Sequence, residues 1–432
     1  MISLIIVLAI IISIALGYKT KINTGLFAIA FAYIIGCYGL KLKAANIISM
    51  WPISIFFVIL ATSLFYNFAL VNGTLEKLSM SLLYLCRRAP RMLPFAIFLA
   101  ATLISALGAG YFSVMVLLVP ITLLICEKME MDPLIGALAA NYGALAGANF
   151  MTSGSGVVFK GLMETAGYGN SAFSYGTTIF IATMIIPIAV LGGYVLFSKD
   201  GKKLSKHMEI TKPEPFNKKQ RLSLALIVIM MVIVLVPPIL HIIFSKNATI
   251  TFINSKVDVG LIAIIFSVIA SVLNLADTKS VIKKVPWNTL IMICGVGILI
   301  AVAIKAGTIK ILANWVGGNI PTFMVPIALC IIGGIMSFFS STLGVVCPAL
   351  FPIVPSIASA TGLNPMLLFT SIIIGAQATS ISPFSSGGSL VLGSCASEDE
   401  SSAMFPRLLF RAVPFCLAVS TVLTIILSFV IR

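Results

Sequence analysis

The sequence predicts an all-α polytopic membrane protein built from two repeats of inverted topology, and three observations support this prediction. Of the 432 residues, 59% are hydrophobic and 9% are charged, whereas about 25% of the residues in soluble domains are charged. Apolar runs of about twenty residues recur along the whole chain, each long enough to cross a bilayer as a helix. Helix-breaking residues of the first half recur in the same order in the second half. A water-soluble fold is therefore excluded.

The recurrence of prolines and glycines indicates an internal duplication. Some of these residues recur 232 positions later, and others, further upstream, recur 234 positions later. We therefore expect a first transmembrane repeat over residues 1–197, a basic linker over 198–221 and a second transmembrane repeat over 222–432. The matched pairs are Pro94 with Pro326, Pro120 with Pro352, Pro133 with Pro365, Gly143 with Gly375, Pro52 with Pro286, Gly73 with Gly307 and Thr74 with Thr308.

Each repeat opens with three membrane spans, the third of which begins at a proline. In the first half the spans are expected over 2–17, 24–40 and 51–72. The third span runs through Gly-Thr into an amphipathic segment, LEKLSMSLLYLCRR, which we expect on the membrane surface rather than across it. The counterparts in the second half are expected over 221–244, 258–276 and 286–306.

The fourth element of each repeat is expected to be a re-entrant hairpin. The apolar stretch at this point is about twice as long as one span, carries no charge and has small residues at its centre, as two half-helices meeting at mid-membrane require. The fifth element begins at Asp132-Pro133 or Asn364-Pro365 and is interrupted by a Gly/Ser-rich segment. A final span closes each half, over 173–197 and 406–431. The four breaks are expected at 106–112, 147–156, 340–344 and 379–388.

The arrangement of positive charges predicts the orientation. A re-entrant hairpin does not change sides, so each repeat has five crossings, one of them the broken helix, and the odd number inverts the second repeat. With the linker in the cytoplasm, 20 of the 28 Lys and Arg residues fall on the cytoplasmic side, as the positive-inside rule requires. We therefore expect a multi-pass protein of the cell's inner (plasma) membrane with both termini outside. The first apolar run has no positive n-region and no small-residue cleavage site, which favours a retained helix over a signal peptide.

The composition also excludes several functional classes. The net charge of +15 lies in short connectors between apolar runs and not in a basic stripe, so we expect no nucleic-acid partner. The eight cysteines are scattered without metal-ligand spacing and are interpreted as small buried residues. The sequence shows no pairing of a nucleophile with a base and no metal-ligand cluster. We therefore expect no enzyme, no catalytic residue and no cofactor.

The chemistry is expected at the four breaks. Broken backbone at membrane depth is tolerated only where it is buried in protein or lines a watery cavity. Half-helix N-termini suit carboxylates or similar anions, and free carbonyls with Ser and Thr oxygens suit Na⁺. Small and hydroxylated residues also pack at helix contacts, but as a set at four repeat-related breaks they indicate a site. The expected substrate-binding residues are Gly108, Ala109, Gly110, Asn149, Thr152, Ser153, Ser341, Thr342, Pro383, Ser385 and Ser386, and the expected Na⁺ ligands are Ser340, Thr342, Thr379 and Ser380.

Charged groups inside the predicted spans are scarce. The one clear intramembrane pair is Lys160 and Glu164, spaced i, i+4 after the first Gly/Ser break. This spacing is typical of a neutralised local ion pair; the alternative is that Lys160 faces the negative charge of a substrate. Because proton-coupled pumps usually rely on buried carboxylates, their scarcity favours Na⁺ over H⁺ as the coupling ion.

Two tripeptides at the hairpin tips carry a family resemblance. The second tip, Ser-Ser-Thr at 340–342, nearly matches the Ser-Asn-Thr signature of divalent-anion/sodium symporters, whereas the first tip, Gly-Ala-Gly at 108–110, has no side-chain oxygen. Together with the repeat pattern, these segments make the chain resemble the ion-transporter superfamily over essentially its whole length. It is most similar to the malonate/dicarboxylate carrier (MatC-like) family, and TRAP transporter membrane subunits are further relatives. The resemblance implies that a dicarboxylate and Na⁺ bind between the tips and the breaks.

The function implied by this resemblance is secondary active transport, with Na⁺-coupled uptake of small dicarboxylates such as malonate or C4 acids. Two alternatives stay open. One is a superfamily member that carries another solute, such as a monocarboxylate, citrate, gluconate, arsenite or Na⁺/H⁺, and the other is the membrane subunit of a TRAP-type complex. The expected partners are the dicarboxylate anion and the lipid bilayer, and a homodimer is compatible with the sequence. The substrate, the ion stoichiometry and the oligomeric state are left open.

Overall fold

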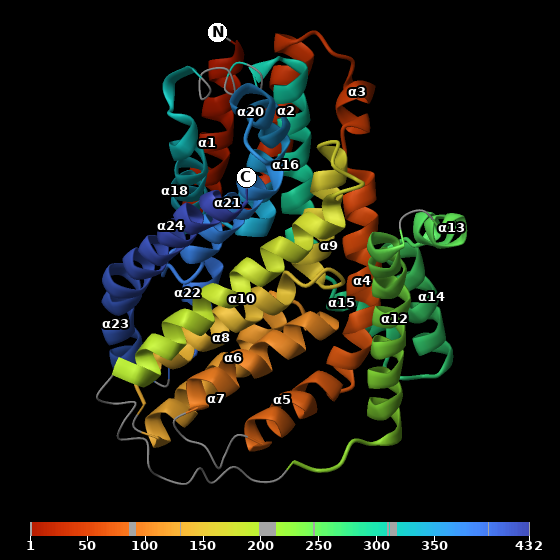
Figure 1. Ribbon diagram of the computed structural model, residues 1–432, viewed down its shortest axis with the longest axis vertical. Coiled ribbons are helices and arrows are strands. Elements are labelled where there is room, and N and C mark those ends of the chain that lie inside the picture. Colours follow the sequence, from red (N-terminus) through yellow and green to blue (C-terminus); the bar gives the residue numbers. More distant parts are fainter. Residues whose placement is uncertain are drawn as a thin grey trace.

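The computed structural model describes residues 2–85, 92–129, 131–197, 213–244, 247–308, 311, 318–395 and 397–431. Within these ranges the chain consists of helices joined by turns and short connectors, with no strand (Figure 1). Among the described helices, six are long and apolar enough to cross a membrane, or seven if one bent pair counts as a single span. The predicted all-α polytopic membrane protein is therefore confirmed.

The first half follows the predicted order of elements. The third predicted span, 51–72, is α4, which begins after Pro52. The predicted amphipathic segment is α5, which follows α4 through Gly73 at a φ of +73°. The elements are α1 (Ile2–Thr20), α2 (Thr24–Tyr33) with a π-helical turn (Ile34–Gly39), α3 (Ala44–Ser49), α4 (Ile53–Val71), α5 (Thr74–Leu85), α6 (Leu93–Ile104), α7 (Tyr111–Lys128), α8 (Pro133–Ala148), α9 (Gly154–Thr165) and α10 (Ala172–Phe197).

The second half contains a short helix, α13, that the sequence analysis did not predict. The short helix α13 begins after Asn247, whose side chain accepts from Thr249 N and Ile250 N, and it meets α14 at an angle of 65°. Most of the predicted linker, over 198–212, lies outside the described residues, and α12 begins at Lys218, within the predicted linker. The elements are α12 (Lys218–Ile243), α13 (Ala248–Lys256), α14 (Val259–Val272), α15 (Thr278–Lys283), α16 (Trp287–Lys305), α18 (Val325–Phe338), α19 (Cys347–Leu350), α20 (Val354–Thr361), α21 (Pro365–Ala378), α22 (Ser386–Gly393), α23 (Glu398–Arg407) and α24 (Val413–Val430).

The helical path is interrupted at all four predicted breaks. They separate α6 from α7, α8 from α9, α18 from α19 and α21 from α22. At the first break Gly108 has a φ of +95° and Gly110 a φ of +72°, a backbone region that L-residues avoid. Both helices that carry a Gly/Ser break start in the same way, because Asp132 and Asn364 cap the N–H two residues later and a proline fills the first helical position.

Close backbone contacts in the centre of the molecule are equivalent in the two halves. α6 packs on α8 and α18 packs on α21. An added Cβ at Gly143 of α8 would lie 2.4 Å from the carbonyl oxygen of Phe98, and one at Gly375 of α21 would lie 1.9 Å from that of Cys330. These two glycines, which match in the predicted repeat, allow each broken helix to pack directly on its neighbour's backbone.

Around this centre, helices of one half pack on helices of the other half. α4 of the first half packs on α14 of the second, and α16 of the second half packs on α2 of the first. Side chains secure both pairs: Asn72 at the end of α4 donates to Leu275 O at 3.2 Å, and Asn23 before α2 donates to Asn288 Oδ1 at 2.6 Å. In Figure 1, α4, α12 and α14 lie together on the right, and α1, α2 and α16 lie together at the top. Each half therefore shares its buried surface with the other.

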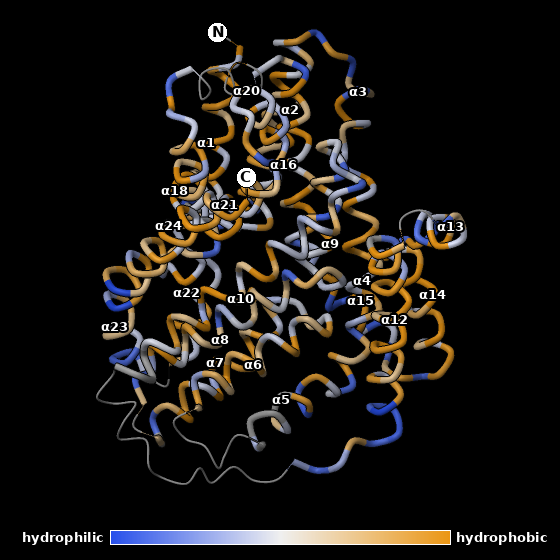
Figure 2. Tube along the Cα trace, viewed as in Figure 1, coloured by the Kyte–Doolittle hydropathy of each residue, from blue (hydrophilic) through white to orange (hydrophobic). Residues whose placement is uncertain are grey.

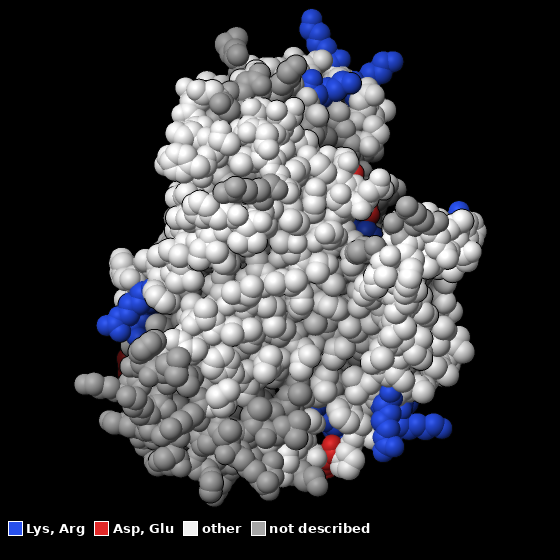
Figure 3. Space-filling view, in the orientation of Figure 1, with Lys and Arg blue, Asp and Glu red and all other residues white. Residues whose placement is uncertain are grey.

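The surface agrees with a membrane location. Figure 2 shows hydrophobic residues along most of each helix and hydrophilic residues gathered at helix ends, such as the lower end of α12. On the face drawn in Figure 3, most Lys and Arg lie at the edges of the molecule, and the broad surface between them is uncharged apart from a small group of acidic and basic atoms at the upper right. Long helices such as α12 and α14 expose large apolar side chains, among them Val232 and Val272, as contact with lipid requires.

Candidate functional site

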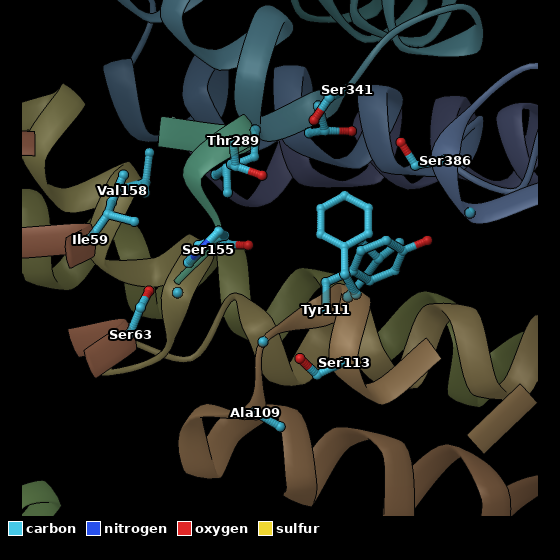
Figure 4. A pocket seen from close by; sticks show the side chains of 18 of the residues that line it. Ile59, Ser63, Ala109, Tyr111, Ser113, Ser155, Val158, Thr289, Ser341 and Ser386 are labelled. Carbon is cyan, nitrogen blue, oxygen red and sulfur yellow. The ribbon is translucent and has the colours of Figure 1, made fainter. Parts of the chain in front are cut away.

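The four breaks converge on one cavity of about 150 Å³. Its walls are the middle of α4, the turn before α7, the first turn of α9, the connection from α15 to α16, the turn after α18 and the first turn of α22. Figure 4 shows Ser341 and Ser386 of the second half on one side of the cavity and Ala109 and Ser113 of the first half on the other. Segments that are more than 200 residues apart in the chain therefore build a single site.

The predicted site residues fall into two groups. One group lines the cavity: Gly108, Ala109, Gly110, Ser340, Ser341, Thr342, Ser380, Ser385 and Ser386. The second group, Asn149, Thr152, Ser153, Thr379 and Pro383, does not line it and instead shapes the breaks. Ser153 Oγ donates to Ser105 O at 2.6 Å, and Thr379 Oγ1 donates to Gly334 O at 2.8 Å. Pro383 O accepts from Ser389 Oγ at 3.2 Å, and Thr152 Oγ1 is buried without a hydrogen-bond partner.

Three helices begin at the cavity without a side-chain cap. They are α7, α9 and α22, whose N-cap residues are Gly110, Ser153 and Ser385. Gly110 has no side chain, and the two serine hydroxyls donate to carbonyls, Ser153 to Ser105 O at 2.6 Å and Ser385 to Ser382 O at 2.9 Å. The first N–H groups of a helix have no intrahelical acceptor, and they carry the positive end of the helix dipole. The cavity therefore receives three uncapped helix N-termini, a geometry that suits an anion.

The charged groups of the site differ from those the sequence indicated. Lys160 does not line the cavity; its Nζ lies 3.6 Å from Glu164 Oε1, in the local pair that the i, i+4 spacing predicts. Among the described residues that line the cavity, Lys284 is the charged one, and none is Asp or Glu. The sequence interpretation missed Lys284 because it lies in a connector, where a basic residue also serves membrane orientation.

Polar residues of α4 were also missed. Thr62, Ser63, Tyr66 and Asn67 line the cavity from the middle of this helix, and Tyr66 Oη donates to Thr152 O at 3.2 Å. A signal was present in the sequence, because these residues form two i, i+4 pairs within an otherwise apolar span. Residues at that spacing share one helix face, so the polar face of α4 was predictable.

Two buried polar links join the breaks of the two halves. In one, Tyr111 Oη donates to Asn141 Oδ1 at 2.6 Å, and Asn141 Nδ2 donates to Ser380 Oγ at 3.0 Å. In the other, Asn149 and Gln377 exchange two amide hydrogen bonds, each of 2.9 Å. Buried hydrogen-bond networks of this kind favour a single arrangement of the groups they join. Because Tyr111, Ser380 and Gln377 also line the cavity, these links fix the positions of its walls relative to one another.

Comparison with known proteins agrees with this fold. Residues 1–148 match the family described as the dicarboxylate carrier protein MatC N-terminus. The YdaH transporter of Alcanivorax borkumensis has a similar structure, with a TM-score of 0.62 and 17% identity over 88% of this chain and 86% of that one. MtrF of Neisseria gonorrhoeae, described as one of a class of antimetabolite efflux pumps, aligns with a TM-score of 0.53 and 14% identity over 93% of this chain and 85% of that one. No curated protein matches the sequence.

Proposed function

We propose that this transporter, whose first 148 residues carry the MatC-like N-terminal region, moves small dicarboxylate anions such as malonate or a C4 acid across a membrane. The match to a carrier family identifies the chain as a transporter and not an enzyme. The observation that carries the choice of substrate is the set of three uncapped helix N-termini around a cavity whose described lining has no carboxylate.

The charge balance of the cavity favours a dianion. Each helix N-terminus contributes roughly half a positive charge, so three of them offset a good part of two carboxylates. Hydroxyls that line the cavity, among them Ser155, Ser341 and Ser386, supply further donors. A cation would meet the positive ends of three helices, and a neutral solute would leave them uncompensated. No buried arginine is needed in this arrangement.

We propose Na⁺ as the coupling ion, with its ligands at the second hairpin tip and the second Gly/Ser break. Ser340, Thr342 and Ser380 line the cavity there, and Thr342 Oγ1 lies 2.8 Å from Ser337 Oγ. A hydroxyl that donates one hydrogen bond keeps lone pairs for a cation, and neutral oxygen ligands suit Na⁺.

The Thr342→Ala variant tests the coupling ion, and it should raise the Na⁺ concentration needed for half-maximal uptake. Thr62→Ala is a matched control, because Thr62 lines the cavity from α4 in the first half of the chain. Uptake that follows a pH gradient and ignores Na⁺ contradicts this part of the proposal.

We also propose that the protein lies in the plasma membrane with both termini outside and the 198–221 linker in the cytoplasm. The support is the charge distribution of the sequence. Single cysteines introduced at Ser171, after α9, and at Ser205, which lies outside the described residues, should react with impermeant reagents from opposite sides. Labelling of both from one side contradicts the inverted orientation.

One uptake experiment tests the substrate class directly. The purified protein is reconstituted in liposomes, and labelled mono-, di- and tricarboxylates are offered with and without a Na⁺ gradient. We expect uptake of dicarboxylates that depends on Na⁺. Uptake of another solute class overturns the choice of substrate, and uptake that requires an added binding protein favours the TRAP-type alternative.

A further inference from the structure

Lys284 is an exposed basic residue at the mouth of the cavity. It is the C-cap residue of α15, two positions before Pro286, the N-cap residue of α16, and it lines the cavity while its side chain remains exposed. Asn67 of α4, itself a cavity residue, donates to Val281 O of α15 at 3.2 Å and so holds this short helix against the cavity wall. No ion pair in the described part of the chain involves Lys284.

The preceding residue, Lys283, has a different environment. It does not line the cavity, and its charge interacts with the carboxylate of Asp277 at the start of α15. That carboxylate accepts from Ser280 N at 2.9 Å and from Ser280 Oγ at 2.7 Å, and these hydrogen bonds, with the nearby Lys283, lower the pKa of Asp277. The two adjacent lysines are both exposed, but Lys284 lines the cavity and Lys283 does not.

The equivalent position in the first half carries no charge. Met50 is the C-cap residue of the six-residue helix α3, as Lys284 is of the six-residue helix α15, with φ and ψ of −77° and −4° against −83° and −3°. Each is followed, two residues later, by the proline that caps the next helix. Met50 does not line the cavity. The same backbone position thus has an apolar side chain in one half and, at the open cavity, a cation in the other.

We propose that Lys284 is the mouth cation of the transport site, which attracts the substrate anion and sets a preference for dianions over monoanions. This inference rests on the proposed function. An unpaired charge at the rim of a site mainly changes the rate of association and its dependence on salt. Its attraction for a ligand grows with the ligand's charge and is screened over about 8 Å at physiological ionic strength. Lys284 is therefore a positioning and selectivity residue, whereas the helix N-termini form the binding surface itself.

The experiment measures equilibrium binding of radiolabelled malonate and acetate to the purified full-length protein. Na⁺ is held constant and the ionic strength is varied with choline chloride. At low ionic strength we expect Lys284→Gln to weaken acetate binding about twofold and malonate binding about fivefold, because a unit charge about 8 Å away in water contributes about a factor of two for each negative charge of the ligand. The difference between wild type and variant should shrink as salt is added. Lys284→Arg should restore wild-type binding.

Lys283→Gln is the matched control, since it removes the same charge from the neighbouring residue, and it should bind malonate as the wild type does. Lys284→Gln binding that equals wild type at every ionic strength overturns the inference, and so does an equal loss in Lys283→Gln. The proposed function fails separately: in that case the wild type itself binds neither carboxylate. Thermal unfolding of each variant in detergent shows that the exposed substitutions leave the fold intact.

Discussion

Replacing Gly110 with alanine should damage the transport site through the backbone rather than through a clash. Gly110 has a φ of +72° and a ψ of 154°, a region that is essentially restricted to glycine and costs another residue about 1–3 kcal/mol. An added Cβ would meet no heavy atom within 4 Å, because Gly110 borders the cavity. The methyl group therefore has room, and the whole effect comes from the conformation of the tip.

The protein can respond to this strain in two ways, and both are measurable. If the tip keeps its shape, the free energy of unfolding falls by about 1–3 kcal/mol. If the tip relaxes, the N-terminus of α7 moves away from the anion; one charge-assisted hydrogen bond is worth about 1.5–3 kcal/mol, which corresponds to about a 10- to 100-fold loss of affinity. Gly110→Val adds a larger group at the same place and should abolish uptake in a protein that remains folded in detergent.

Alanine substitutions at two other glycines serve as controls that separate the effect of backbone strain from the effect of filling the cavity. Gly154 lines the cavity, has no atom within 4 Å of an added Cβ and has no positive φ, so Gly154→Ala fills the cavity without strain. Gly362 has a φ of +73° and equal space but lies outside the cavity, so Gly362→Ala is strained without touching the site. Thermal unfolding and malonate binding are measured for all three alanine variants. If Gly110→Ala keeps both wild-type stability and wild-type affinity, the argument from the tip conformation is wrong.

Three further predictions concern the polar groups around the cavity. Tyr111→Phe removes the donor to Asn141 Oδ1 and should lower the free energy of unfolding by about 1–3 kcal/mol, because a buried acceptor loses its partner; thermal unfolding and uptake measure the two consequences. Asn149→Leu removes both hydrogen bonds from the Gln377 amide, and Gln377→Leu leaves the Asn149 amide with its hydrogen bond to Thr183 Oγ1 but without the Gln377 partner, so the double variant should lose less stability than the sum of the two single variants, and a strictly additive cycle contradicts the pairing. Lys160→Gln should transport at close to the wild-type rate, because the Lys160 side chain is paired locally and lies outside the cavity lining; loss of binding in this variant indicates a fixed cation at the substrate.

The membrane class, the order of the helices and the four breaks were all predictable from the sequence. Hydropathy and helix-breaking residues act locally, so each element could be located without knowing its neighbours. The predicted break at 147–156 corresponds to the gap between α8 and α9, and the one at 379–388 to the gap between α21 and α22. The short helix α13 was not predicted, because its nine residues form no span and have no counterpart in the first half.

Which side chains face the cavity was decided only by the tertiary structure. Thr379 and Ser380 are adjacent in the sequence, yet Thr379 Oγ1 donates to Gly334 O behind the site while Ser380 lines the cavity. The rotation of each half-helix and its packing against segments more than 200 residues away select between them, and no local pattern records that choice.

The same reason explains why the sequence analysis singled out Lys160 and missed Lys284. Lys160 follows a break and is close to it in the sequence, but it forms a pair with the Glu164 side chain one turn later. Lys284 lies in a connector, and the contact between Asn67 and Val281 brings its helix to the cavity. Composition and spacing determined that a membrane protein would have broken helices at its centre. The packing of α4 on α14 and α15 determined where the cation lies, because long-range contacts between the halves place a connector beside a site that the local sequence does not reveal.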